Sequence, residues 1–245
     1  MKRLCRTIRI PILLICCSCT PQDIGKRHDS GNPYGLEIVQ TVAAYQKSVR
    51  ATPDKAFVNL RSFIPLLMMD IRYATTNNFT KKQVYAKAMA FLRRPAAEKL
   101  REAQTCLADQ GLGLIVFDAY RPYSDTIRFY EIRPDPNFCA DPRKGSRHNR
   151  GCAVDVSLYD LKTGRPLPMP SDFDDFSERA HPNDTHATAE TKANRDRLIS
   201  MMARHGFTVF PTEWWHYDFT GWEKFPLTDL SFESLSEQTS PSAAR

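Results

Sequence analysis

The stretch SRHNRGCAVDVSLYD, residues 146–160, places a histidine and an aspartate seven positions apart around a glycine and ends in an alternation typical of a β-strand. A helix would separate His148 from Asp155 by two turns, about 10 Å, which is too far for one ion to contact both side chains. A turn at Gly151 that folds back onto a strand removes that distance. Asp155 has apolar neighbours, and a half-buried carboxylate needs a cation or several hydrogen-bond donors. The stretch therefore predicts a turn followed by a strand, with a metal ion as one cation that would satisfy Asp155.

The length and composition of the chain indicate a single domain. Its 245 residues are 42% apolar and 25% charged, which is a globular composition. Helix and strand patterns are interleaved, and the last two strand-like segments are too close in sequence for a helical crossover, so neighbouring strands should be antiparallel. We predict an α+β fold in which residues 36–230 form one domain with a mainly antiparallel central sheet and flanking helices. Helices are predicted near 36–49, 96–110, 123–132 and 189–205, and strands near 112–120, 207–210 and 214–219.

The first twenty residues have the pattern of an export signal. Four basic residues precede an apolar stretch, Ile10 to Cys17, that is too short to span a bilayer. The stretch ends in Cys-Cys-Ser-Cys and resembles the lipobox of bacterial lipoproteins, in which the cysteine after the cleavage site is acylated. Cys19 fits that position best and Cys17 is a poorer second choice. An ordinary signal cut nearby, or an uncleaved apolar tail, is the alternative.

This leader sets the expected organisation and location of the chain. We predict a lipoprotein signal peptide at 1–18, a polar tether at 19–35 and a polar, serine-rich tail at 231–245, which makes the protein an exported lipoprotein held at the membrane by its lipid. Removal of residues 1–18 takes away four positive charges and no acids, so the net charge of +6 becomes +2. The basic charge therefore gives no support for a nucleic-acid partner.

Four cysteines remain after such a cut: Cys19, Cys106, Cys139 and Cys152. Cys152 lies beside the predicted strand and is most simply a small buried hydrophobic residue. If Cys19 carries lipid, Cys106 and Cys139 are the possible disulfide pair, which export would permit. The remaining cysteines show no Cys-x-x-Cys spacing, which argues against a thiolate zinc site.

The stretch EWWHYDF at 213–219 is the second informative motif. Glu213 and His216 are three residues apart, and on an ideal strand such residues face opposite sides. For both to reach one site the chain must bend at Glu213, and Pro211-Thr212 supplies a plausible break. His216 would then be a metal ligand, with Glu213 as a neighbour that does not bind the metal directly.

Together the two motifs predict an open metal centre. His148, Asp155 and His216 plus one water would form a tetrahedral zinc site with an open position, as in catalytic zinc sites. Zinc lowers the pKa of its water toward about 7, and Glu213 is placed to take the proton. The alternative is that both histidines are ordinary polar residues and that Asp155 belongs to a salt bridge.

Five segments resemble those of the D-alanyl-D-alanine dipeptidases, which are zinc enzymes. They occur in the family's order and span about residues 50–225. The Ser-x-His-x6-Asp and Glu-x-x-His motifs alone indicate only the wider group of D,D-peptidases and Hedgehog-type zinc folds, and the segments DAYRP and FDDFSERAH narrow the resemblance to the dipeptidases. The segments are DIRYATTNNFT, FDAYRP, SRHNRGCAVD, FDDFSERAH and EWWHYDF.

The resemblance implies a role for each matching catalytic residue. It makes His148, Asp155 and His216 the ligands of one zinc ion per chain, and Glu213 the general base that later returns its proton to the leaving amine. It gives Arg121 the role of binding the carbonyl oxygen and the oxyanion that develops there, which suits a guanidinium because it stays charged.

Three more residues match positions that the family uses around its substrate. Asp118 would orient Arg121 through a charge-assisted hydrogen bond. Asp174 matches the position that holds the free ammonium of the substrate, although SDFDDFSERA by itself has the pattern of a solvated acidic run, and Asp175 could be confused with it. Ser146 matches a position whose hydroxyl contacts the substrate.

The function implied is zinc-dependent hydrolysis of the D-alanyl-D-alanine dipeptide to free D-alanine. An exported enzyme cannot destroy newly made dipeptide in the cytoplasm, so salvage of dipeptide released from the cell wall is the more coherent role. A D,D-carboxypeptidase or peptidoglycan endopeptidase on the same scaffold is the enzymatic alternative. A lipoprotein that binds wall fragments through zinc without cleaving them is the alternative of another class, and the presence of Glu213 counts against it.

Overall fold

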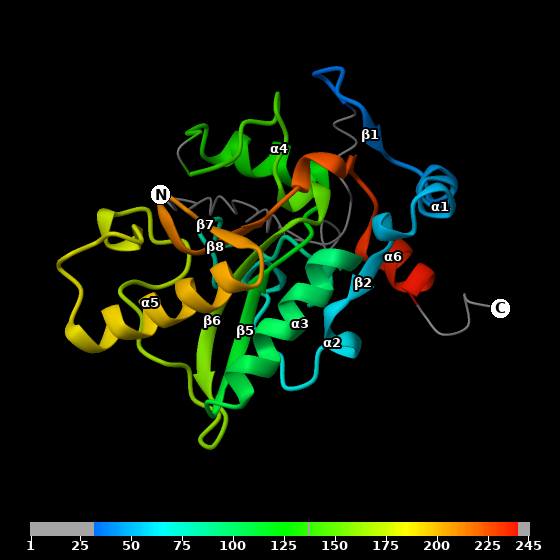
Figure 1. Ribbon diagram of the computed structural model, residues 1–245. Helices are drawn as coiled ribbons and strands as arrows, with labels where there is room; N and C mark the ends of the chain where they lie inside the picture. The colour runs from blue at the N-terminus through cyan, green and yellow to red at the C-terminus, as the bar shows by residue number, and fades with distance from the viewer. Residues whose placement is uncertain (1–31, 137, 240–245) are drawn as a thin grey trace, which may run out of the picture.

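The computed structural model describes residues 32–136 and 138–239. Its centre is a five-stranded sheet in the order β3-β5-β6-β8-β7 (Figure 1). β3 runs parallel to β5, and the other neighbouring pairs are antiparallel. The predicted α+β fold with a mainly antiparallel sheet is confirmed. The strands are β3 (Met68–Met69), β5 (Leu112–Asp118), β6 (Ala153–Asp160), β7 (Phe207–Phe210) and β8 (Glu213–Phe219).

The two central strands are covered on both faces. All of β5 is buried, and β6 is buried from Ala153 to Tyr159. Strands that are covered on both sides are nearly continuous apolar runs, which explains LGLIVF in β5. The buried charged exceptions are carboxylates at matching positions, because Asp118 pairs with Asp155 across the β5–β6 ladder. These two buried acids mark the end of the sheet at which the site forms.

Helices α3 (Arg94–Ala108) and α5 (Ala189–Arg204) pack together against one side of the sheet, with α5 beside β7 (Figure 1). A helix that buries one stripe repeats its apolar residues every three or four positions, and both helices do so. The apolar buried residues are Ala96, Ala97, Leu100, Ala103 and Leu107 of α3, and Leu198, Met201 and Met202 of α5.

Shorter elements complete the domain. β1 (Ile38–Val39) pairs in parallel with β9 (Leu227–Thr228), and β2 (Phe57–Asn59) pairs antiparallel with β4 (Phe91–Arg93). The remaining α-helices are α1 (Val42–Ala51), α2 (Leu60–Phe63), α4 (Tyr123–Ile132) and α6 (Phe232–Thr239). The 3-10 turns are Pro53–Lys55, Arg72–Ala74, His148–Arg150, Glu178–Ala180 and Trp222–Lys224.

The ends of the domain differ from the prediction. The first helix begins at Val42 and not near residue 36, because Thr41 caps it by accepting a hydrogen bond from the Ala44 N–H at 3.2 Å. The polar tail predicted from residue 231 is wrong in its first part, since α6 packs onto the domain. Phe232 and Leu235, three residues apart, are buried within this serine-rich stretch, and the Phe232 ring lies 4.7 Å from that of Tyr85. Composition concealed these two apolar contacts.

The cysteines of the domain are free thiols, so the possible disulfide between Cys106 and Cys139 does not form. Cys106 is exposed on α3, with its sulfur 3.7 Å from His205 Nε2, whereas Cys139 is buried. Cys152 is fully buried, as predicted. The predicted signal peptide, Cys19 and most of the tether lie outside the described residues. Within residues 32–136 and 138–239, no helix has the length and apolar character needed to cross a membrane.

Candidate active site and metal centre

A glycine turn carries His148 back onto β6, as the sequence predicts. Gly151 has a φ of +68°, and its N–H donates to the His148 carbonyl at 3.0 Å to close the turn. A Cβ at Gly151 would lie 2.3 Å from a ring carbon of Phe57, so glycine is needed there both for its backbone conformation and for its lack of a side chain. The turn places His148, only 2% exposed, above the start of the strand.

The register of the sheet brings the other two candidate ligands together. Asp155 on β6 lies directly opposite His216 on β8. Residues opposite each other in an antiparallel pair have adjacent side chains, so this register places a carboxylate beside an imidazole. The pairing of β7 with β8 shifts after Val209, and Phe210 then pairs with Glu213. This irregularity flanks Pro211 and Thr212, where the sequence predicts a break, and it lets Glu213 and His216 line the same cavity.

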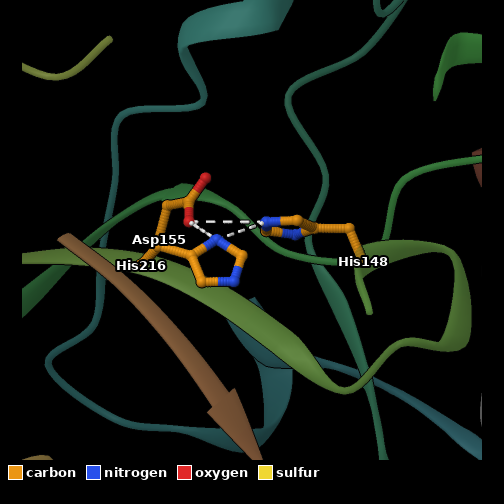
Figure 2. A group of neighbouring side chains, drawn as sticks. All are labelled: His148, Asp155 and His216. Atoms are coloured by element: carbon orange, nitrogen blue, oxygen red, sulfur yellow. Dashed lines mark hydrogen bonds and ion pairs between the residues drawn. The ribbon is translucent and has the colours of Figure 1, made fainter. Parts of the chain in front are cut away.

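Three ligand atoms point at one another (Figure 2). His148 Nε2 lies 3.1 Å from His216 Nδ1 and 3.4 Å from Asp155 Oδ1, and His216 Nδ1 lies 3.1 Å from Asp155 Oδ1. Ligands bound about 2.0–2.1 Å from a tetrahedral zinc ion are about 3.3 Å apart, so the triangle has the size that zinc requires. Asp155 Oδ1 is also buried, and apart from these two imidazoles it has no partner among the described residues, as expected of an atom that binds a cation.

The second nitrogen of each imidazole is engaged by an acceptor. His148 Nδ1 lies 2.5 Å from the Ala119 carbonyl oxygen, and His216 Nε2 lies 3.0 Å from Asp218 Oδ1. A proton on these nitrogens leaves His148 Nε2 and His216 Nδ1 free to bind a metal, which is the usual arrangement behind histidine ligands. The prediction from sequence did not include Asp218. The alternation of the strand could have revealed it, because Asp218 is two residues from His216 and shares its face.

The charge of this cluster also favours a cation. Burial disfavours the Asp155 carboxylate, but the two imidazoles outweigh that effect and hold its pKa below the usual range. Burial similarly opposes the charged form of His216, yet contacts with Asp155 and Asp218 raise its pKa to about 10. The metal-free site therefore retains a proton that a metal must displace.

Arg121 is fixed by Asp118, as the resemblance implies. Its Nε and Nη2 donate to Asp118 Oδ2 at 3.1 and 2.7 Å, and its guanidinium carbon lies 4.8 Å from the centre of the Phe129 ring. Asp118 is 1% exposed, and it accepts a further hydrogen bond from Tyr85 at 3.0 Å. Arg121 lines the cavity whereas Asp118 does not, so Asp118 would act on a ligand only by positioning Arg121.

A cavity of about 360 Å³ adjoins the three ligand residues. Ser146 lines it and also accepts a hydrogen bond from the His148 N–H at 3.2 Å, so its hydroxyl supports the turn. The free thiol residue Cys139 is part of the wall. Other aromatic and apolar lining comes from Tyr73, Phe79, Phe129, Phe138, Phe176, Phe210, Trp215 and Trp222.

Glu213 lies beside the candidate metal centre without belonging to it. Its Oε2 is 3.7 Å from His216 Nδ1. Burial raises the pKa of Glu213 to about 8, with the charges of Asp155 and Asp174 adding to the rise and His216 opposing it. In its ionised form such a carboxylate is a stronger base than an exposed one, and a cation bound at the triangle would lower its pKa toward neutrality, which suits a general base.

Asp174 reaches the cavity from a left-handed backbone conformation that residues other than glycine rarely adopt. Its φ is +60°, and its carboxylate accepts a hydrogen bond from the Tyr73 hydroxyl at 3.1 Å and a weaker one from the Phe79 N–H at 3.5 Å. Burial, with Asp155 adding to it, raises the pKa of Asp174 to about 7. No cationic side chain of the described residues forms a salt bridge with it. Asp175 does not line the cavity, which resolves the ambiguity between the two aspartates. Tyr73 was not predicted, because it lies 101 residues away.

Comparison with known proteins shows which family the chain belongs to. A family model described as D-ala-D-ala dipeptidase, of the M15 peptidases, matches residues 54–233. The chain belongs to the D-Ala-D-Ala dipeptidase family. It is therefore a zinc metallopeptidase, and the triangle of His148, Asp155 and His216 is the candidate zinc site.

Curated relatives agree with this assignment to the dipeptidase family. The chain is 33% identical over 172 residues to a D-alanyl-D-alanine dipeptidase of Escherichia coli strain K12, covering 69% of this chain and 88% of that protein. It is 34% identical over 181 residues to the D-alanyl-D-alanine dipeptidase of Enterococcus faecium, covering 66% of this chain and 90% of that one.

Solved structures are more distant. A vancomycin resistance D,D-dipeptidase in complex with a D-Ala-D-Ala phosphinate analogue is 17% identical, with a TM-score of 0.36 and 74% of each chain covered. A zinc-bound mutant of a vancomycin resistance D,D-pentapeptidase is 16% identical, with a TM-score of 0.35, covering 55% of this chain and 75% of that one.

We expect the purified protein to hold about one zinc per chain, because the three ligand atoms already stand at zinc-site spacing. Metal analysis should show that the His148→Ala, His216→Ala double variant has lost it. His205→Ala, which alters an imidazole outside the cavity, is the control and should retain zinc. Chelator competition should also show weaker zinc binding at lower pH, because zinc must displace the proton held by His216. Full zinc content in the double variant would contradict the ligand assignment.

Proposed function

We propose that the protein hydrolyses the free dipeptide D-alanyl-D-alanine to two molecules of D-alanine. The observation that carries the proposal is that one cavity joins the three metal ligands to Glu213, Arg121 and Asp174. Glu213 supplies a base, Arg121 supplies a cation for a developing oxyanion, and Asp174 supplies an acid without a cationic partner for an ammonium. The curated relatives are themselves D-alanyl-D-alanine dipeptidases, which supports the choice of substrate.

The chemistry can be divided among the residues of the cavity. Zinc held by the triangle would polarise the peptide carbonyl and make a water molecule more acidic. Glu213 accepts a proton from the attacking water and returns it to the leaving amine, for which its raised pKa and its position beside His216 are suited. Arg121 donates to the carbonyl oxygen as negative charge develops there, and Asp118 and Phe129 hold its guanidinium in place for this role.

Asp174 supports a dipeptide over a longer peptide. A buried carboxylate without a cation is costly, and a free ammonium offers both charge and N–H donors. A peptide extended at its amino end would present a neutral amide at this place instead. Recognition by Asp174 therefore favours the dipeptidase over the carboxypeptidase or endopeptidase on the same scaffold. The position of Glu213 favours an enzyme over a protein that only binds wall fragments.

Location completes the proposal. The basic start, short apolar run and Ser18-Cys19 support export and acylation of Cys19, with the domain held at the membrane surface of the cell envelope. An enzyme outside the cytoplasm meets dipeptide released from the wall and not newly made dipeptide. Salvage of wall-derived D-alanine is therefore the role that we propose.

Replacing the base should abolish turnover while leaving the metal in place. We expect Glu213→Gln to retain zinc and to lose about 100-fold or more in kcat, because it removes proton transfer and keeps the shape of the side chain. The measurements are kcat with D-alanyl-D-alanine and zinc content. Glu190→Gln, at an exposed position of α5, is the matched control and should behave as wild type. Wild-type turnover in Glu213→Gln would refute the role of Glu213.

Substrate length tests the dipeptidase assignment directly. We expect cleavage of free D-alanyl-D-alanine, with a kcat/KM at least about 100-fold above that of its N-acetyl form and of a wall pentapeptide ending in the same residues, because these leave Asp174 without its ammonium. Asp174→Asn should slow the free dipeptide and narrow the gap, whereas Asp175→Asn, which changes the adjacent acid outside the cavity, should do neither. Comparable cleavage of the pentapeptide would favour the carboxypeptidase.

Lipidation is tested at Cys19 itself. Metabolic labelling with a fatty-acid analogue should mark the wild-type protein in the membrane fraction and should not mark Cys19→Ala. Cys17→Ala, at the poorer alternative position, should still be labelled. An unlabelled cytoplasmic wild-type protein would overturn both the anchor and the salvage role, and it would leave the zinc chemistry untouched.

A further inference from the structure

The proposed substrate is charged at both ends, and Asp174 accounts only for its ammonium. The C-terminal carboxylate needs a cation within the same cavity. Four cationic side chains line the cavity, and they differ in how far their nitrogens are already engaged. They are Arg121, Lys144, Arg147 and Arg150.

Two of the arginines are committed elsewhere. Arg121 makes two hydrogen bonds to Asp118, so most of its charge is already balanced, and it faces the carbonyl in the proposed reaction. Arg150 donates from Nη1 to the Phe225 carbonyl oxygen, so its two terminal nitrogens are not both free to bind a carboxylate. The side chain of Lys144 is exposed, and within the described part of the chain it forms no hydrogen bond or ion pair. It provides positive charge at the rim but no fixed geometry.

Arg147 is fixed at one edge and open at the other. Its Nε is buried and forms an ion pair with Asp218 Oδ2 at 3.5 Å, without a hydrogen bond, and its guanidinium carbon lies 4.9 Å from the centre of the Trp222 ring. The side chain is nevertheless 40% exposed, and the described residues provide no hydrogen bond to Nη1 or Nη2. One edge is thus held by a carboxylate and one face by an aromatic ring, while the terminal nitrogens remain available to a ligand.

Asp218 connects this guanidinium to the metal centre. Its Oδ1 accepts from His216 Nε2 at 3.0 Å, while its Oδ2 faces Arg147 Nε. Arg147 also directly precedes His148 in the chain. The position of the Arg147 guanidinium is therefore linked to two metal ligands. It is linked to His148 through the backbone and to His216 through Asp218.

We propose that Arg147 determines specificity by binding the C-terminal carboxylate of the dipeptide, an inference that rests on the proposed function. A guanidinium matches a carboxylate with two parallel N–H donors, and preorganisation by Trp222 and Asp218 lowers the cost of ordering the side chain. The substrate class is then a zwitterion: a D,D-dipeptide with both ends free, its ammonium on Asp174 and its carboxylate on Arg147.

The test compares D-alanyl-D-alanine with its C-terminal amide on the zinc-loaded, full-length protein. The wild type should prefer the free acid in kcat/KM by about tenfold or more, because the amide carries no charge for Arg147. Arg147→Ser should lose about tenfold or more on the acid, mainly through KM, and change by less than about threefold on the amide. Arg147→Lys should recover part of the preference. Arg197→Ser, at an exposed position of α5 outside the cavity, has the same change in net charge and should match wild type.

Two results would overturn the proposal. One is a wild-type preference for the acid in Arg147→Ser. The other is an equal loss on acid and amide, with or without loss of zinc, which would make Arg147 a support of the metal site through Asp218. If the wild type cleaves neither compound, the proposed function fails. Calorimetric binding of the dipeptide and its amide to the same variants then still tests Arg147, because the acid should bind more tightly only where the guanidinium is present.

Discussion

The organising constraint of this molecule is the buried carboxylate of Asp155 on a strand with both faces covered. Its Oδ1 lies 3.1 and 3.4 Å from two imidazole nitrogens and has no other partner among the described residues. A charge in that position must be compensated, since desolvation of an unpaired carboxylate costs several kcal/mol. The register of β6 with β8, the turn at Gly151 and the acceptors behind both histidines all bring positive charge to this atom.

The rest of the cavity follows from how each charge is balanced. Asp118 balances most of the charge of Arg121, so Arg121 can donate to a carbonyl oxygen without binding the carboxylate of a substrate tightly. Asp174 accepts hydrogen bonds only from the Tyr73 hydroxyl and, at a longer distance, from the Phe79 N–H among the described residues, so no cation balances its carboxylate. Arg147 is held by its Nε and its aromatic face, with its outer nitrogens open. The charges of Asp174 and Arg147 that the fold leaves without a full set of partners are the ones that a charged substrate can pair with.

The polar cluster carries costs that the apolar core offsets. Asp174 adopts a left-handed backbone conformation that is uncommon outside glycine, and Glu213 and Asp174 are acids with raised pKa values. Such groups disagree with local propensity and with burial, and they persist because the covered sheet and its helices fix their surroundings. Local violations of this kind gather around the cavity and are therefore signs of chemistry.

The sequence by itself determined the features that depend on near neighbours. The turn before β6, the break near Pro211, the bounds of α4 and the antiparallel sheet follow from residue types and spacing, and the motifs with their family resemblance indicated His148, Asp155, His216 and Glu213. Only the tertiary structure decided which distant groups meet. Tyr73 reaches Asp174 across 101 positions, α6 closes over Tyr85, and Trp222 and Asp218 hold Arg147. Local pattern cannot give these contacts, because sheet register and helix packing set them and each joins segments that are independent until the chain folds.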